Sequence, residues 1–453
     1  MNTASPAAPQ ALKKRAVKGG LWASVGFGFG QLIRLSSNLV MARLLAPEAF
    51  GLMAIAIAID FFLCMLSDLG IEGSIMRSKK GETSEFLATA RLAQLGRNTL
   101  IAMFLVIIAL ALPAMVQSGW FTATSVYADE RLPIFIYIVA AGMFLDGFQT
   151  MRVAVHNRKL DVLPVVRLEI VSQLCGVFAT IGSALAGIGV FSLAIGMFVS
   201  HAAKVVGSFV LVKGLPAKFE FHRDHFDEIF SYGKWIIVAS TFSFFVVRGD
   251  QVILGGLLDI RPFSLFAMAT IWLMAARNLV EMVVRRVTYP VFSEVRRERP
   301  EELPRIFRQL RLAVEAGSIV IFFGILLCSD FAIKILYPEE FHDVSHYMKL
   351  LAVSVLFLPY RVHHNIILTA GQSRRYSYLT AIPGIILFIG TPIVFERFGA
   401  DAAIIFATIS PIFALPFNLN FAGSLVKLNY ARECMMAVIA CAASYYLLTY
   451  VHL

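Results

Sequence analysis

The 453-residue sequence is poor in charged residues, which make up only 15% of the chain. Soluble domains carry roughly 25% charged residues, whereas 58% of this chain is hydrophobic. A soluble protein of this size would lack the polar residues needed to cover its surface. Apolar stretches of about 20 residues recur from Leu21 to Tyr450, and this length suits membrane-spanning helices. The composition therefore excludes an ordinary soluble domain.

The alternating polarity of membrane β-strands is also missing. The segment 100–116 is apolar throughout, whereas a barrel strand alternates over roughly 10 residues. Only helices and closed barrels satisfy the hydrogen bonds of the backbone inside hydrocarbon. The sequence therefore predicts an all-α polytopic membrane protein.

Motifs of cofactor and nucleotide chemistry are missing as well. The sequence has no P-loop, which disfavours an ATP-driven pump. Its five cysteines have neither the paired spacing of a metal site nor that of a disulfide framework, so we interpret them as small core residues. They are Cys64, Cys175, Cys328, Cys434 and Cys441. We expect no cofactor and no metal.

Lysine and arginine are distributed unevenly between the loops. The net charge of +10 could indicate nucleic-acid binding, but the basic residues lie mostly between the apolar stretches. With a cytoplasmic N-terminus, the basic residues around 77–80, 152–159 and 213–223 fall in cytoplasmic loops, and loop 112–130 has none. This asymmetry follows the positive-inside rule. It supports the span count and predicts a multi-pass membrane protein with its N-terminus in the cytoplasm.

Thirteen spans divide the chain into two lobes. We expect them at 20–43, 49–68, 88–115, 131–150, 164–186, 189–212, 230–256, 263–287, 307–328, 346–369, 376–396, 400–424 and 432–450. The expected domains are a basic N-terminus (1–19), a six-helix lobe (20–212), a cytoplasmic linker (213–229), a second six-helix lobe (230–425) and one additional helix (426–453). The Arg-rich loop 285–311 is expected to form a short amphipathic element on the membrane surface.

An internal repeat supports the two lobes. A shift of 213 positions places Gly20 and Trp22 on Gly233 and Trp235, and the turn that follows also matches. The further matches are Leu44, Leu45, Phe50, Leu52 and Ala54 with Leu257, Leu258, Phe263, Leu265 and Ala267. Because six spans separate the copies, both lobes cross the membrane in the same sense. The sequence therefore predicts two parallel six-helix bundles around a charged central cavity.

Several charged residues fall within the expected spans. A charge at the bilayer centre costs about 2.5–3.5 kcal/mol even on the lenient insertion scale, so it needs a cavity or a partner. Arg34 and Arg248 lie at similar depths, roughly 20 Å from the cytoplasmic helix ends. The guanidinium fork suits diphosphate oxygens. The candidate substrate-binding residues are Arg34, Arg248, Arg277, Arg361 and His364, and those for ion coupling or charge pairing are Asp60, Asp146, Asp250 and Glu281.

A purely structural role is open for some of these groups. Arg277 and Glu281 could form a pair within one helix, and Asp60 could neutralise Arg34. His363 and His364 could titrate with proton flux or serve only as hydrogen-bonded groups.

The N-terminal third carries a family resemblance. Residues 42–52 read Ala-Arg-Leu-Leu-Ala-Pro-Glu-Ala-Phe-Gly-Leu, followed by Ser-Asp-Leu-Gly-Ile at 67–71 and Ser-Ile-Met-Arg at 74–77. This stretch resembles the polysaccharide transporter (Wzx-type) flippases of the multidrug/oligosaccharidyl-lipid/polysaccharide exporter superfamily. The resemblance implies a V-shaped exporter fold in the bacterial inner membrane and alternating access driven by an ion gradient. It also implies export of undecaprenyl-diphosphate-linked repeat units from the cytoplasmic to the periplasmic leaflet. It also leaves association with polysaccharide polymerase machinery open.

Two other functions compete with this interpretation. A membrane glycosyltransferase or polymerase would need a sizeable extramembrane domain, but the longest loops have roughly 30 residues. The segment 222–228 has catalytic-looking residues, but it better fits the polar start of a helix. An ion-coupled drug exporter of the same superfamily would need an acidic cavity for cationic drugs, whereas several of the deep charges here are arginines.

Overall fold

The computed structural model describes residues 7–216 and 218–450, and this part of the chain is helical with no β-strand. Contacts divide it into two compact units, Met1–Ser118 with Glu130–Thr241 and Gly119–Asp129 with Phe242–Leu453. We call these the N-terminal and C-terminal units. The division falls inside one helix, at 241/242. The domain boundaries expected from the sequence stay predictions.

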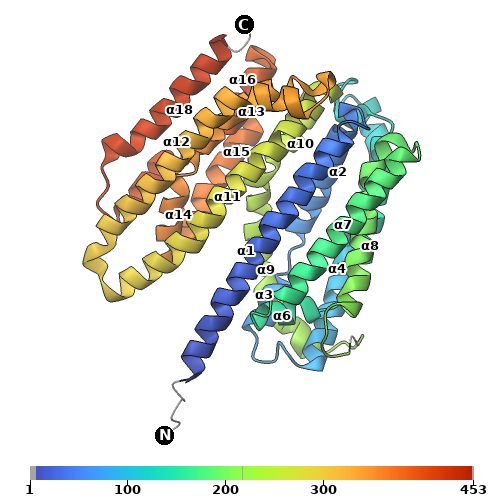
Figure 1. Cartoon of the computed structure of the whole chain (residues 1–453), viewed down its shortest axis with the longest axis vertical. Coiled ribbons are helices and arrows are strands. Elements are labelled where there is room, and N and C mark those ends of the chain that lie inside the picture. The colour runs from blue at the N-terminus through green and yellow to red at the C-terminus, as the bar shows by residue number, and fades with distance from the viewer. Residues whose placement is uncertain (1–6, 217, 451–453) are drawn as a thin grey trace. The chain divides into compact units, whose positions relative to one another are not determined.

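The N-terminal unit contains eight α-helices and most of a ninth (Figure 1). They are α1 (Ala7–Met41), α2 (Pro47–Leu66), α3 (Ile71–Arg77), α4 (Ser84–Gln117), α5 (Leu132–Asp146), α6 (Arg152–Arg158), α7 (Leu163–Leu185), α8 (Ser192–Val210) and α9 (Arg223–Val247), with the 3-10 turn η2 (Gly189–Phe191) before α8.

The C-terminal unit contains the remaining helices. They are α10 (Gly249–Leu257), α11 (Ile260–Glu298), α12 (Leu303–Leu336), α13 (Val344–Ala352), α14 (Tyr360–Thr369), α15 (Ser373–Phe398), α16 (Ala400–Ile409), α17 (Leu415–Gly423) and α18 (Tyr430–Tyr450). The 3-10 turns are η1 (Val126–Ala128), η3 (Pro300–Glu302), η4 (Glu339–Phe341), η5 (Val353–Phe357) and η6 (Ser410–Ala414).

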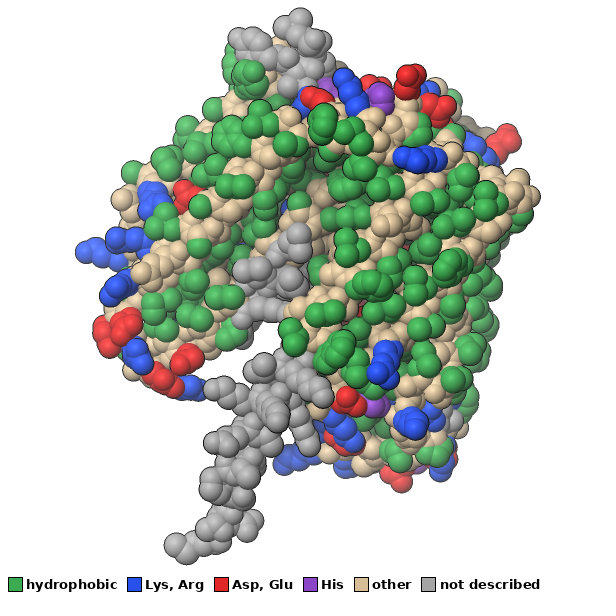
Figure 2. Space-filling view, in the orientation of Figure 1, with side chains coloured by type: hydrophobic (Ala, Val, Ile, Leu, Met, Phe, Trp, Pro, Cys, Tyr) green, Lys and Arg blue, Asp and Glu red, His purple; other side chains and the backbone are tan. Residues whose placement is uncertain are grey.

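The helices have the length and surface of membrane spans. Nine helical segments of the described chain are long and apolar enough to cross a bilayer. Their outer faces carry large apolar side chains, such as Leu327 (77% exposed) and Phe331 (71% exposed). In Figure 2 hydrophobic side chains cover the helices along their length, and charged side chains gather toward their ends. Exposed apolar area on this scale indicates contact with lipid.

Each of the thirteen expected spans coincides with helical chain, but three are interrupted. The range 230–256 breaks at Arg248, whose φ of −138° is not helical. The range 346–369 tightens into η5 before Pro359, and 400–424 tightens into η6 around Pro411. Proline lacks an N–H and clashes with the preceding turn, which favours a kink or a break in an α-helix at these two places. Arg248 has no such cause in its own sequence, so this break could not be predicted.

The expected amphipathic element at 285–311 is wrong. Helix α11 continues to Glu298 and α12 begins at Leu303, so the connection is only Arg299 and the η3 turn. Arginine and glutamate are good helix formers, which allows both helices to extend beyond the apolar segment. Pro300 and Pro304 stand at helix starts, where a missing N–H costs nothing.

The internal repeat has a structural counterpart in the helix starts. Helix α2 begins at Pro47 and α11 begins at Ile260, and these starts are separated by the same shift of 213 positions. Each follows a short break after a preceding helix, α1 and α10 respectively. The side chain of Trp235, which matches Trp22 in the sequence, lies outside the described side chains.

Candidate functional site

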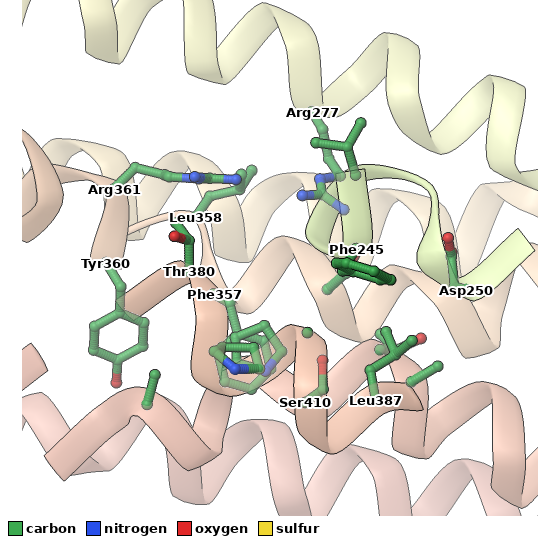
Figure 3. A pocket seen from close by; sticks show the side chains of 18 of the residues that line it. Phe245, Asp250, Arg277, Phe357, Leu358, Tyr360, Arg361, Thr380, Leu387 and Ser410 are labelled. Atoms are coloured by element: carbon green, nitrogen blue, oxygen red, sulfur yellow. The ribbon is translucent and has the colours of Figure 1, made fainter. Parts of the chain in front are cut away.

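A cavity of about 130 Å³ lies within the C-terminal unit, where the three interrupted spans meet (Figure 3). Phe245 and Asp250 reach it from either side of the break at 248. Ser354 and Phe357 reach it from η5, and Ser410 from η6. Irregular backbone is tolerated at membrane depth only where it is buried in protein or lines a polar cavity. Broken spans are typical of substrate sites in transporters.

Two arginines from different helices form the cationic wall of this cavity. Arg277 comes from α11 and Arg361 from α14, and in Figure 3 both side chains extend into the same space. Oε1 of Glu281 lies between them, 3.9 Å from Nη2 of Arg277 and 3.4 Å from Nε of Arg361. The pairing of Arg277 with Glu281 that the sequence left open is present. The same carboxylate also forms an ion pair with Arg361 of another helix, α14.

The rest of the wall offers unsatisfied hydrogen-bonding groups. Nδ2 of Asn418 lies 3.3 Å from Nε2 of His364, and both residues line the cavity. Nδ1 of His364, Oδ1 of Asn418 and Oγ of Ser354 are buried and have no hydrogen-bond partner among the described residues. Because a buried polar atom without a partner is costly, such atoms indicate a place for a polar ligand or water.

The candidate residues Arg248 and Asp250 flank the start of α10 and differ in whether they line the cavity. Asp250 lines the cavity, and one of its carboxylate oxygens accepts from the N–H of Gln251 at 2.9 Å. Arg248 donates from Nη1 to Oε1 of Gln251 at 2.8 Å and does not line the cavity. The substrate-binding role of Arg248 stays a prediction.

A second group of buried charges lies in the N-terminal unit. Oδ2 of Asp146, at the end of α5, is 2.8 Å from Nδ1 of His201 on α8. Asp60 on α2 is only 9% exposed and interacts electrostatically with Asp146, His201 and Arg97. Oδ1 of Asp60 and Oδ1 of Asp146 have no hydrogen-bond partner in the described chain. The structure therefore brings together two carboxylates, Asp60 and Asp146, that the sequence left far apart.

The Asp60 group does not include Arg34. Arg97 donates to the carbonyl oxygens of Ser67 and Cys64 at 2.8 and 2.7 Å, so it satisfies the C-terminal end of α2 and faces Asp60. Arg34 is exposed on α1 and is not among the groups that interact electrostatically with Asp60. Its proposed role in substrate binding stays a prediction.

The sequence analysis missed a third charged group, which we call the α18 network. Oε2 of Glu433 accepts from Nη2 and Nε of Arg311 at 3.0 and 3.2 Å, and Nη1 of Arg311 lies 3.4 Å from Glu315. The side chains of Arg311, Glu315 and Glu433 are at most 8% exposed. Tyr360 donates to the carbonyl of Glu433 at 2.6 Å, which ties α14 to α18. Partners 122 residues apart leave no local signal in the sequence.

The nine long apolar helical segments of the described chain define a multi-pass membrane protein. The chain matches the polysaccharide biosynthesis protein family over residues 40–346, more than half its length, and therefore belongs to that family. The succinoglycan biosynthesis transport protein ExoT of Rhizobium meliloti (strain 1021) is 20% identical over 318 residues. The match covers 70% of this chain and 61% of ExoT, so it spans less than two thirds of that relative.

Two solved structures share the fold. The lipid II flippase MurJ in an inward closed conformation superposes with a TM-score of 0.68 at 12% identity, covering 94% of this chain and 97% of that one. An inward-facing multidrug resistance MATE family transporter of the MOP superfamily gives 0.62 at 14% identity, covering 92% and 99%. The resemblance to the polysaccharide transporters of this superfamily and the all-α polytopic fold class are confirmed.

Proposed function

We propose that this protein is a flippase for undecaprenyl-diphosphate-linked oligosaccharide units, moving them from the cytoplasmic to the periplasmic leaflet by alternating access. The units would serve exopolysaccharide, capsule or O-antigen synthesis. The observation that carries the proposal is the cavity of the C-terminal unit, where Arg277 and Arg361 face one space at three helix breaks. Membership of the polysaccharide biosynthesis family and the names of its relatives, a succinoglycan transport protein and a lipid II flippase, support the same substrate class.

The chemistry of the cavity suits a diphosphate sugar. Two guanidinium groups present several N–H donors in fixed planes, which match phosphate oxygens better than a lysine would. The unsatisfied atoms of His364, Asn418 and Ser354 can exchange hydrogen bonds with sugar hydroxyls or the phosphoester. His364 is proposed as a substrate-binding group on this basis.

An ion-coupled drug exporter of the same fold is the second candidate, and the MATE likeness is what favours it. Such an exporter would hold cationic drugs against carboxylates. Asp250 is the one carboxylate among the cavity-lining residues of the described chain, against the two guanidinium groups of Arg277 and Arg361. The excess of positive charge among the lining residues favours an anionic substrate.

Purified protein in vesicles is expected to move an undecaprenyl-diphosphate-linked sugar without ATP. The sequence has no nucleotide-binding motif, and the family resemblance implies an ion gradient as the source of energy. The assay measures the fraction of labelled lipid that becomes accessible to a membrane-impermeant reagent. An absolute ATP requirement would rule out the proposed mechanism. Rapid transport of a cationic dye with no lipid movement would favour the drug exporter.

The carboxylates of the N-terminal unit are proposed to couple transport to an ion gradient. Replacing Asp60 with asparagine removes one of two adjacent buried carboxylates while keeping its shape. We expect vesicle transport by this variant to lose its response to an imposed pH gradient, whereas binding of substrate is unchanged. The matched control is Glu72→Gln, an exposed residue of the same unit. A gradient response equal to that of the wild type would exclude Asp60 from coupling.

A further inference from the structure

Glu281 contacts its two arginines at longer distances, and with less burial, than Glu433 of the same unit contacts Arg311. Its two contacts, at 3.9 and 3.4 Å, are ion pairs that make no hydrogen bond among the described residues. The side chains are 33% (Arg277), 34% (Glu281) and 31% (Arg361) exposed, so all three are accessible from the surface. In the α18 network, by contrast, Arg311 and Glu433 are hydrogen-bonded at 3.0 Å and nearly inaccessible.

The position of Glu281 suits a site that binds an anion. Arg277 and Arg361 interact electrostatically with each other, and two like charges repel. One carboxylate oxygen between them reduces that repulsion. The same oxygen contacts both guanidinium groups. An anion that binds both arginines would place one of its own oxygens at this position.

We propose that Glu281 is a displaceable counter-ion: its carboxylate pairs with the two arginines that line the cavity, and the diphosphate of the substrate must replace this carboxylate to bind both of them. This inference rests on the proposed function and adds a residue that sets affinity and selectivity. Glu281 is therefore a competitor for the arginines. It is not a ligand of the substrate.

Exchange of one anion for another explains how a transporter can hold arginines inside the membrane without binding its substrate too tightly to release it. Binding must be favourable enough to load the site and weak enough to release the cargo. A diphosphate brings more negative charge and more acceptor oxygens than the single carboxylate that it displaces, whereas a monovalent anion gains little by the exchange. A neutral or cationic molecule cannot take the carboxylate's place, so Glu281 also discriminates against such molecules.

The test is the affinity of purified protein for a diphosphate group, measured by calorimetry with inorganic pyrophosphate and with undecaprenyl diphosphate. Glu281→Gln is expected to bind both about tenfold more tightly than the wild type, because the competing charge is gone while the side-chain shape remains. Glu281→Asp, which keeps the charge but shortens its reach, is expected to lie between the two. Tighter binding of the lipid than of pyrophosphate would identify the lipid headgroup as the natural source.

The matched control is Glu340→Gln, an exposed residue in η4 of the same unit, which removes one negative charge far along the chain from the arginines and should leave the affinity unchanged. Equal or weaker binding by Glu281→Gln would overturn the proposal, because it would show that Glu281 organises the arginines for the substrate. Wild-type affinity in Arg361→Ala would instead show that the anion does not use this site. That result would overturn the proposed binding site together with the role of Glu281.

Discussion

Replacing Glu433 with alanine is expected to destabilise the C-terminal unit by about 3–5 kcal/mol, the typical cost of breaking a buried ion pair. Glu433 accepts two hydrogen bonds from Arg311 in a site where both side chains are less than 10% exposed. Without it, the ion pair left to Arg311 within the described chain is the longer contact to Glu315 at 3.4 Å. Thermal unfolding of the purified protein in detergent measures the effect.

An exposed pair of the same unit provides the control for this prediction. Glu302 lies 3.7 Å from Arg299, and both side chains are about half exposed or more. Glu302→Ala is expected to change the free energy of unfolding by less than about 1 kcal/mol. If Glu433→Ala unfolded at the same temperature as Glu302→Ala, the α18 network would not hold α18 against α12 and α14.

Replacing both Arg277 and Arg361 with alanine is expected to lower the rate of lipid translocation at least about 100-fold. A hydrogen bond to a charged group is worth about 1.5–3 kcal/mol, so each arginine contributes roughly a tenfold to hundredfold effect. Each single variant should therefore retain part of the activity. The vesicle assay with labelled undecaprenyl-diphosphate-linked sugar measures these rates.

Arg308→Ala is the matched control, because Arg308 is an exposed residue of α12 and does not line the cavity. It should translocate lipid at the wild-type rate. A double Arg277/Arg361 variant that inserts normally and still transports at that rate would exclude the described cavity as the path of the diphosphate.

The sequence predicted the helices well because their causes are local. Runs of apolar residues and the distribution of lysine and arginine define spans without knowledge of tertiary contacts. Prolines marked two of the three interruptions, at 359 and 411, although we read both segments as continuous spans. The extension of α11 to Glu298 was missed, because a charged stretch that leaves the bilayer as a helix looks like a polar loop.

The site was only partly predictable for a physical reason. The spacing of Arg277 and Glu281 indicated a pair on one helix face, and the structure shows it. Nothing local indicated that Arg361, 80 positions further along, closes on the same carboxylate. Asp60 was weighed as a partner of Arg34, but its neighbours are Asp146, His201 and Arg97, which come from three other helices. Long-range pairing of charges is set by helix packing and leaves no periodicity in one sequence.

The most direct test of the central claim is the affinity of the purified protein for three lipids that differ only in the headgroup: undecaprenyl diphosphate, undecaprenyl monophosphate and undecaprenol. If Arg277 and Arg361 recognise the diphosphate, affinity should fall in that order in the wild type, and the ranking should vanish in the Arg277→Ala/Arg361→Ala variant. Equal affinity of the wild type for undecaprenyl diphosphate and undecaprenol would contradict the account.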